Sequence, residues 1–322
     1  MTYTLLLRRC RAVAIRAFLL WTLALPLLAQ SANPNQIALL RWYGANTTTS
    51  FSAGADPWGL TFDGANIWIT NYISSGTVTK LRANDGANLG AFAVGANPKA
   101  AAFDGANIWV ANALSNTVTK LRASDGSNLG TFVGGTYPCS LAFDGANMWV
   151  ANASSSNVTK LRASDGTNLG TFTIGTSGGP LAIVFDGTNL WTANGYSGTV
   201  TKLRPSDGAV LAVYSAGAYP DALCFDGTSL WIANETGATV TKMRPSDGYI
   251  LGTYTVGSYP MGLAYDGANV WVANWYSSTV TKLRATDGAN LGTFSTPYPV
   301  GVAFDGSNLW FANLYSNTVS KM

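Results

Sequence analysis

The stretch FDGANIWVANALSNTVTKLRASDG, residues 103–126, decides the fold, because versions of it occur seven times along the chain. The aromatic-Asp-Gly landmark that opens the stretch stands at Phe62, Phe103, Phe143, Phe185, Phe225, Tyr265 and Phe304. A fixed period of roughly 40 residues is typical of a β-propeller or another repeat array. The repeat therefore determines the class of architecture before any single residue is considered.

Each copy predicts four short β-strands. In the second copy we expect them at residues 99–103, 107–112, 117–123 and 128–135, where β-branched and aromatic residues alternate. Asp-Gly pairs and clusters of Ser, Asn and Gly separate these runs, as turns between strands require. Four strands in about 40 residues make one propeller blade. The sequence therefore predicts an all-β, seven-bladed β-propeller with four antiparallel strands per blade.

The two ends of the repeat region predict how the ring closes. The seventh copy stops at residues 318–322, after its third strand, and residues 39–57 align with the fourth-strand region of the first copy, residues 81–98. An open solenoid would instead need capping repeats at its ends. We therefore expect an N-terminal strand to complete the last blade and close the ring.

The first 32 residues differ from the repeats and predict a secretory signal peptide. Four Arg between residues 8 and 16 precede an apolar run at 17–29, and small residues follow. An uncleaved anchor is the alternative, although the run is shorter than the roughly 20 residues of a typical span. We expect residues 33–322 to form one propeller domain without a membrane span, located in the periplasm, at the cell surface or outside the cell.

Charge and composition exclude several classes of function. The chain carries 19 Lys and Arg against 16 Asp and Glu. Without the four Arg of the predicted signal, 15 basic residues remain, and the net charge falls to about −1. We therefore expect no nucleic-acid partner, and we expect a monomer. The chain has no His, which excludes Ser–His and Cys–His nucleophile systems and His metal sites.

The residues that every copy keeps indicate a structural frame. We expect the seven Trp of the second strands to fill the space between blades rather than to form a cofactor cage. Each turn Asp should accept hydrogen bonds from backbone N–H groups, while its Gly takes a positive φ. The DGAN turn lacks the ligand spacing of a calcium loop, so we expect no metal and no cofactor. Lys and Arg of TKLR, such as Lys80 and Arg82, should share one face of an outer strand and pair with turn Asp residues.

Two copies carry a resemblance to known proteins. NIWVANALSNTVTKLRASDG (107–126) and VWVANWYSSTVTKLRATDG (270–288) resemble bacterial YVTN- and NHL-type propeller repeats, and they are similar to virginiamycin B lyase-like seven-bladed propellers. The resemblance covers about residues 38–322 and implies the propeller fold. The lyase chemistry implies a metal and a catalytic His, and no position of this His-free chain can receive that motif.

Positions at which the copies differ predict the functional face. They lie before and after the loop proline and directly after the second strand, which places them on one face around the central channel. The candidate ligand-binding residues are Trp58, Tyr72, Lys99, Tyr196, Asp221, Glu235, Trp275, Tyr276 and Tyr315. Aromatic rings around a concave mouth suit stacking on sugars or gripping a peptide.

These residues predict an extracytoplasmic binding or scaffold module for a cell-surface glycan or protein. Two alternatives stay open. The differing loops could merely tolerate change, or the protein could be a metal-assisted lyase or hydrolase that uses Asp221 and Glu235.

Overall fold

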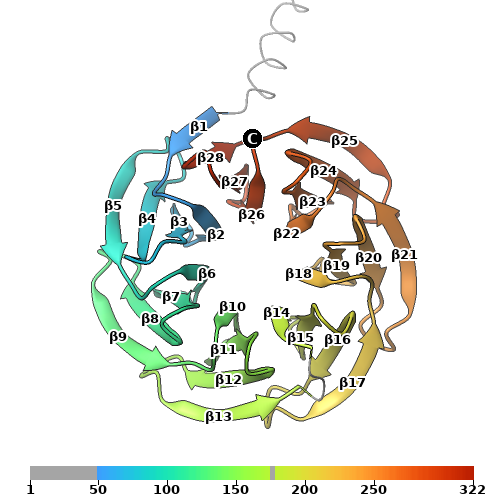
Figure 1. Ribbon diagram of the computed structural model, residues 1–322, viewed down its shortest axis with the longest axis horizontal. Helices are drawn as coiled ribbons and strands as arrows, with labels where there is room; N and C mark the ends of the chain where they lie inside the picture. Colours follow the sequence, from blue (N-terminus) through green and yellow to red (C-terminus); the bar gives the residue numbers. More distant parts are fainter. Residues whose placement is uncertain (1–48, 175–177) are drawn as a thin grey trace, which may run out of the picture. The chain divides into compact units, whose positions relative to one another are not determined.

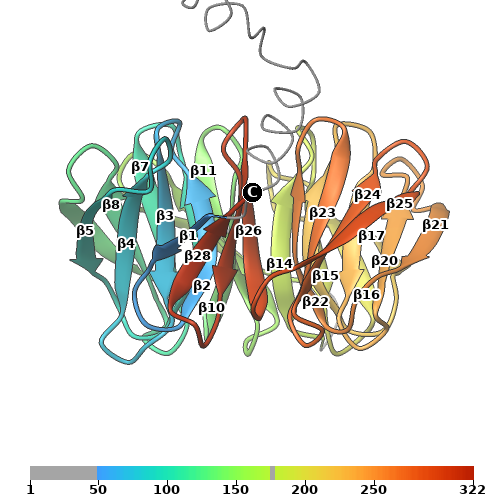
Figure 2. The same ribbon diagram turned by 90° about the horizontal axis from the view of Figure 1, so that it is seen from above.

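The computed structural model describes residues 49–174 and 178–322. Within these residues 28 strands form seven four-stranded antiparallel sheets, which surround a central channel as the blades of a propeller (Figures 1 and 2). The predicted fold is therefore confirmed. The predicted signal peptide, residues 1–32, lies outside the described residues. The described residues contain no helix that is both long enough and apolar enough to cross a lipid bilayer.

The blades are numbered I to VII in chain order, and each contributes one strand to each of four concentric layers (Figure 1). The innermost strands are β2 (Pro57–Phe62), β6 (Pro98–Phe103), β10 (Pro138–Phe143), β14 (Pro180–Phe185), β18 (Pro220–Phe225), β22 (Pro260–Tyr265) and β26 (Pro299–Phe304). The second strands are β3 (Asn66–Asn71), β7 (Asn107–Asn112), β11 (Asn147–Asn152), β15 (Leu190–Asn194), β19 (Leu230–Asn234), β23 (Asn269–Asn274) and β27 (Leu309–Asn313).

The two outer layers follow the same order. The third strands are β4 (Thr77–Arg82), β8 (Thr117–Arg122), β12 (Asn157–Arg162), β16 (Thr199–Leu203), β20 (Thr239–Met243), β24 (Thr279–Arg284) and β28 (Thr318–Lys321). The outermost strands are β5 (Asn88–Ala93), β9 (Asn128–Val133), β13 (Asn168–Thr173), β17 (Val210–Ser215), β21 (Ile250–Thr255), β25 (Asn290–Ser295) and, in the last blade, β1 (Thr49–Ser52).

The N-terminal strand closes the ring as predicted. Strand β1 pairs antiparallel with β28, so that Phe51 lies opposite Val319, and the last blade has the strand order β1-β28-β27-β26. Phe51 stacks on Trp310 at a centroid distance of 5.4 Å, which is the contact that the fourth-strand aromatic makes in the other blades. The remainder of the segment compared above, residues 39–48, lies outside the described residues.

The core lies between the blades. Six of the seven second-strand Trp are fully buried, and Trp271 is nearly so. Trp109 packs with Val118 of its own blade and with Met148, Val150 and Leu161 of the next. A strand that is covered on both sides needs large apolar side chains on both faces, because both faces leave water. The prediction that the Trp fill the space between blades is therefore confirmed.

The first Asp-Gly turn holds the Trp as well as itself. Asp144 accepts hydrogen bonds from the backbone N–H groups of Ala146 and Asn147, at 2.9 and 2.6 Å. Its second carboxylate oxygen accepts the indole N–H of Trp149 at 2.8 Å, and all seven blades repeat this contact. Partial burial raises the pKa of Asp144, but these hydrogen bonds outweigh it and lower the pKa below the usual value.

The glycine of the second Asp-Gly turn is fixed by two independent requirements. Gly126 has φ of +77°, and a Cβ there would lie 2.0 Å from a ring carbon of Phe92 in the preceding blade. Its turn therefore needs both the backbone freedom and the missing side chain of glycine. The outer-strand aromatic of one blade thus packs directly on the turn of the next.

The prediction for the Lys of TKLR is wrong, whereas the prediction for the Arg is confirmed. Lys80 is buried, lies 4.9 Å from the ring centroid of Trp68, and donates a 2.7 Å hydrogen bond to the carbonyl oxygen of Ala123 in the next blade. Arg82 lies outside and pairs with Asp85 of its own turn at 2.9 Å. The strand is the third of four, so its neighbours cover the Lys and leave an interblade carbonyl as its partner. The Lys therefore joins blades.

Candidate functional site

The innermost strands enclose the candidate site. Together they surround a central cavity of about 180 Å³. The residue after each loop proline lines this cavity; these residues are Trp58, Lys99, Cys139, Leu181, Asp221, Met261 and Val300. The predicted placement of these positions beside the channel is therefore confirmed. Cys139 and Cys224, which lie two blades apart, are both buried and free.

A repeated backbone hydrogen bond brings the other differing positions to the same edge of each blade. The residue after the second strand donates its N–H to the carbonyl oxygen of the residue before the proline. In blade V, Glu235 donates to Tyr219 at 2.8 Å, and in blade VI, Trp275 donates to Tyr259 at 2.9 Å. Because the strands are antiparallel, the same edge carries the start of the innermost strand. The differing residues thus gather on one face, called here the variable face.

The residue before the proline has an unusual backbone in every blade. Its φ lies between 46° and 58°, the left-handed region, which glycine and asparagine enter most easily. Blade IV has Gly179 there, and blade II has Asn97. Four blades instead place a tyrosine at this position; these are Tyr137, Tyr219, Tyr259 and Tyr298. The backbone conformation therefore does not explain these four tyrosines.

The tyrosines complete three side-chain clusters on the variable face. Each of the nine candidate residues belongs to one of these three clusters. The first cluster surrounds Lys99, whose ammonium nitrogen lies 5.4 Å from the ring centroid of Trp58 and 5.9 Å from that of Tyr137. Tyr72 contributes a ring 5.0 Å from Trp58, and its hydroxyl oxygen lies 2.9 Å from that of Tyr137. We call this set the lysine cluster.

The second set, the acidic cluster, combines Asp221 and Glu235 with two tyrosines. Burial raises the pKa of Asp221 above its usual value, and the Lys99 ammonium offsets only part of this rise. Burial and the neighbouring Asp221 raise the pKa of Glu235 to about 7. The pKa of Tyr219 is raised chiefly by burial and by its hydrogen bond with the Tyr196 hydroxyl. The nearby carboxyl groups of Glu235 and Asp221 raise it further. Pro220 pairs with Asn234 across the two inner strands, so Asp221 and Glu235, which follow these residues, lie at the same end of blade V.

The third set, the aromatic patch, spans blades VI and VII. Tyr259, Tyr276 and Tyr315 lie around Trp275 at centroid distances of 5.8, 6.4 and 6.4 Å. Tyr298 packs edge-on against Tyr315 at 5.6 Å. The Tyr276 and Tyr315 side chains are 69% and 62% exposed, although each touches other rings. Such exposed, mutually supported rings form a platform for stacking.

The pre-proline tyrosines were expected on this face but were not among the nine candidate residues. Their importance depends on the left-handed backbone, which no single copy reveals. The signal that was available is the Tyr-Pro pair, which four copies share while two others show Asn-Pro and Gly-Pro. Read together, these pairs indicate a left-handed position.

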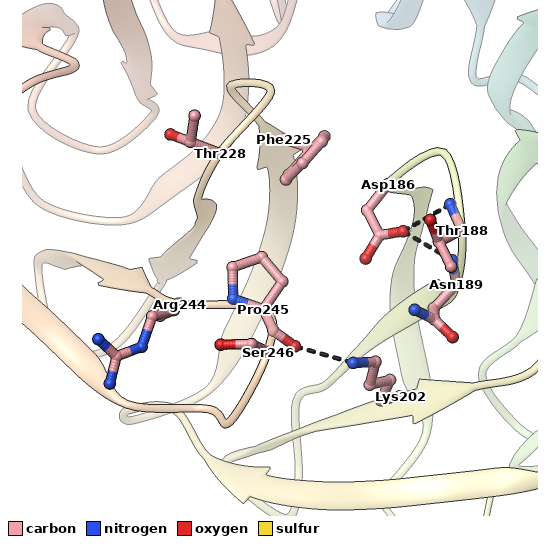
Figure 3. Close-up of a pocket in the computed structure, with 9 residues that line it drawn as sticks. All are labelled: Asp186, Thr188, Asn189, Lys202, Phe225, Thr228, Arg244, Pro245 and Ser246. Atoms are coloured by element: carbon pink, nitrogen blue, oxygen red, sulfur yellow. Dashed lines mark hydrogen bonds between the residues drawn. The ribbon is translucent and has the colours of Figure 1, made fainter.

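The opposite face carries grooves of another kind. Between blades IV and V a cavity of about 330 Å³ is lined by Asp186, Lys202 and Arg244, among others (Figure 3). In it, Lys202 donates to the carbonyl oxygen of Pro245 at 2.8 Å. Equivalent positions line cavities between two further pairs of blades. These grooves repeat with the frame and do not distinguish one blade from another.

Across residues 49–174 and 178–322, no three Cys, Asp or Glu side chains gather closely enough to hold a metal ion.

Comparisons with known proteins agree with the architecture. No protein-family model and no curated protein matches the sequence. A streptogramin B lyase structure is 17% identical, with a TM-score of 0.74 over 85% of this chain and 96% of that chain. A catalytically inactive virginiamycin B lyase from Staphylococcus aureus with quinupristin is 17% identical, with a TM-score of 0.73 over 85% of this chain and 98% of that chain.

A third structure shows that the likeness is not specific to lyases. The hydrazine synthase of Kuenenia stuttgartiensis is 19% identical, with a TM-score of 0.72 over 83% of this chain and 95% of that chain. Because proteins with such different names share this architecture, the likeness carries the fold and leaves activity open. The chain shares the seven-bladed β-propeller fold of the virginiamycin B lyase-like structures.

Proposed function

We propose that the protein is a binding module whose variable face holds a carbohydrate of the cell surface. The observation that carries this proposal is the tyrosine at the left-handed position before the proline in four blades. A tyrosine held there costs about 1–3 kcal/mol relative to a relaxed backbone. Such strained residues cluster at ligand-binding positions, where the contacts of the side chain with the ligand offset the strain.

The chemistry of the variable face favours a sugar over an extended peptide. Trp275, Tyr276 and Tyr315 offer ring faces and hydroxyl groups, which match the apolar faces and hydroxyl rims of sugar rings. A peptide bound by strand addition would need a free sheet edge. The outermost strand of each blade is such an edge, but the aromatic residues of the patch gather on the variable face instead.

The protein would act outside the cytoplasm. The segment predicted as a signal peptide would deliver the domain to the periplasm or the cell surface, where such glycans occur. The repeats would be of the YVTN type. Mass spectrometry of the protein recovered from the periplasm and medium tests the first point, with a mature N-terminus between residues 29 and 33 as the expected result.

A binding screen tests the function. Purified domain is titrated with fragments of peptidoglycan, chitin and other cell-surface polysaccharides, and binding is measured by calorimetry. Tyr276→Ala should weaken the affinity for any bound glycan at least tenfold. Tyr249→Ala is the matched control, because Tyr249 is also 61% exposed but lies in an Asp-Gly turn of the opposite face.

Two results of the screen oppose the proposal. If Trp275→Ala and Tyr276→Ala leave every detected interaction unchanged, the variable face does not bind the glycan. If only proteins are captured through this face, the partner is a protein.

One observation favours the second candidate, a metal-assisted lyase or hydrolase. The pKa of Glu235 is raised to about 7, which suits a general acid or base at neutral pH. Asp221 would then hold the ion while Glu235 transfers the proton. Metal analysis of the purified protein tests this reading. A stoichiometric divalent ion that is lost in Asp221→Ala would favour the enzyme over the binding module.

A further inference from the structure

Charged side chains meet across the channel at the variable face. Lys99 is the second residue of β6 and Asp221 the second residue of β18, and both line the central cavity. Figure 1 shows these two strands on opposite sides of the channel. Glu235 follows β19 and lies beside Asp221, because Pro220 pairs with Asn234 and the two acids are the residues that follow this pair. Asp221 and the Lys99 ammonium both act on the pKa of Glu235.

Within residues 49–174 and 178–322, none of these three groups belongs to an ion pair, although the Lys99 ammonium lies over two aromatic rings. Among the described residues, no group donates a hydrogen bond to the carboxyl of Asp221 or Glu235, and Lys99 has no carboxylate within 4.0 Å. Every other Lys and Arg of blades I to V joins a carbonyl or a turn Asp. Lys99, Asp221 and Glu235 thus differ from the charged residues that hold the blades and turns together.

The count of charges indicates what is missing. Two carboxylates face one ammonium, so the ionised site lacks a single positive charge. The ring of Tyr219 lies beside both carboxyl groups, and the exposed ring of Tyr196 stands edge-on to it at 5.5 Å. An ammonium group is attracted both by carboxylates and by the face of an aromatic ring. The complementary ligand is thus a cation that carries a surface for stacking.

We propose that the acidic cluster at the channel mouth binds one amino-sugar unit, with its protonated amine between Asp221 and Glu235 and its ring against Tyr196 and Tyr219. This inference rests on the proposed carbohydrate function and narrows the ligand to glycans with free amines. The cavity of about 180 Å³ is far larger than the roughly 10–15 Å³ that one water molecule requires, so it has room for a polar group of the ligand. Lys99, across the channel, can donate to the hydroxyl groups on the far side of the ring.

Titration of the site gives an independent signature. In the free protein, burial and Asp221 raise the pKa of Glu235 to about 7, and Lys99 opposes this rise. Tyr219 and the Cys139 thiol are the other titratable groups of this region. A bound cation favours the ionised carboxylate, so the pKa of Glu235 falls on binding. At pH 7 the complex should therefore release about half a proton from Glu235.

Calorimetric titration with two matched probes tests the inference. Glucosamine oligomers and N-acetylglucosamine oligomers of equal length are titrated at pH 7 in buffers of different ionisation enthalpy. The free-amine oligomer should bind at least tenfold tighter, and Glu235 should contribute a release of about half a proton to its binding. In Glu235→Gln the preference should fall below threefold and this contribution should be absent. Asp165→Asn, which removes an exposed acid of the opposite face, should change neither quantity.

Several outcomes overturn the inference. Equal binding of both oligomers, or an amine preference that survives in both Glu235→Gln and Asp221→Asn, contradicts a role for the acidic cluster. If both oligomers bind equally and Tyr276→Ala weakens both, the carbohydrate function stands while the amine site fails. If neither oligomer binds, the amine site fails, and the wider glycan screen decides the carbohydrate function. Circular dichroism of each variant confirms that it is folded.

Discussion

The ammonium nitrogen of Lys321 donates a hydrogen bond to the carbonyl oxygen of Ala83, 2.8 Å away, and so joins the last blade to the first across 238 residues of sequence. Lys321 also donates to the carbonyl oxygen of Asn84 and lies 5.2 Å from the ring centroid of Trp310. The same contacts join blade III to blade IV through Lys160, 45 residues from its partner Pro205. Ring closure therefore uses the ordinary interblade contact, with β1 added.

Lys321→Met should lower the free energy of unfolding by about 1.5–3 kcal/mol, the usual range for hydrogen bonds to a charged group. Chemical denaturation measures this change. Lys160→Met is the matched control and should lose a similar amount. Only Lys321→Met should speed hydrogen exchange in β1 and β28, because these strands lie at the seam of the ring. Equal exchange in both variants would show that the seam is not a weak point.

Trp149→Ala should destabilise the protein by about 3–5 kcal/mol, because it empties a buried site between blades. Trp149→Phe separates the two roles of this residue, since it keeps most of the ring but removes the indole N–H that Asp144 accepts. The phenylalanine variant should lose about 1–3 kcal/mol through the unpaired acceptor. Thermal unfolding of both variants checks this order. Equal losses would mean that the indole hydrogen bond, which both variants lack, accounts for the whole effect and that the buried ring adds nothing measurable.

The seven-bladed fold was predictable because its determinants repeat. The landmark at Phe103, the Trp at 109 and the turn at 125–126 recur in every complete copy, so a chance resemblance in one copy is corrected by the others. Chain pairing at the seam was also predictable, since the missing strand of the last copy appears at the other end. The buried Lys80 was not, because its partner is a backbone carbonyl of the next blade, which leaves no mark in sequence.

The candidate site was predictable only in part. Disagreement among the copies located Lys99, Asp221 and Glu235 on one face, and the structure brings all three to the same channel mouth. Their grouping depends on which blades lie opposite in the ring, which follows from the count of blades. The left-handed backbone of Tyr219 was not predictable from its own copy, because a tyrosine before proline is ordinarily extended.

Glu235→Gln should stabilise the protein at pH 8 and have little effect at pH 5. The folded-state pKa of Glu235 is about 7, above its unfolded value near 4.5, so the folded protein holds this proton more tightly. The corresponding stability is fully present below about pH 4.5 and is lost as the pH rises through 7. Thermal unfolding of both proteins between pH 5 and 8 measures the difference. Parallel curves would place the pKa of Glu235 at its ordinary value.

The turn carboxylates should govern acid unfolding in the opposite sense. The folded-state pKa of Asp104 is lowered; partial burial opposes this, but the hydrogen bonds of Trp109, Ala106 and Asn107 outweigh it. Its stabilisation is present above the unfolded pKa near 3.8 and is lost as the pH falls through the lower folded value. Because five other blades carry such an Asp, stability should fall steeply below about pH 4. Acid titration followed by near-ultraviolet circular dichroism measures this transition, and Asp104→Asn should make it shallower.

Exchange of the pre-proline residues between two blades tests whether strain is retained for binding. Tyr298 has φ of 46°, and Asn97 occupies the same position of blade II with φ of 51°. Because Asn enters the left-handed region more easily than Tyr, Tyr298→Asn should raise the free energy of unfolding by about 1 kcal/mol. The reciprocal variant Asn97→Tyr should lower it by a similar amount. In glycan titrations, Tyr298→Asn should nevertheless weaken binding several-fold, since Tyr315 loses the ring that supports it at 5.6 Å. A variant that is less stable and binds as well as the wild type would show that Tyr298 serves the packing of the blade rather than the ligand.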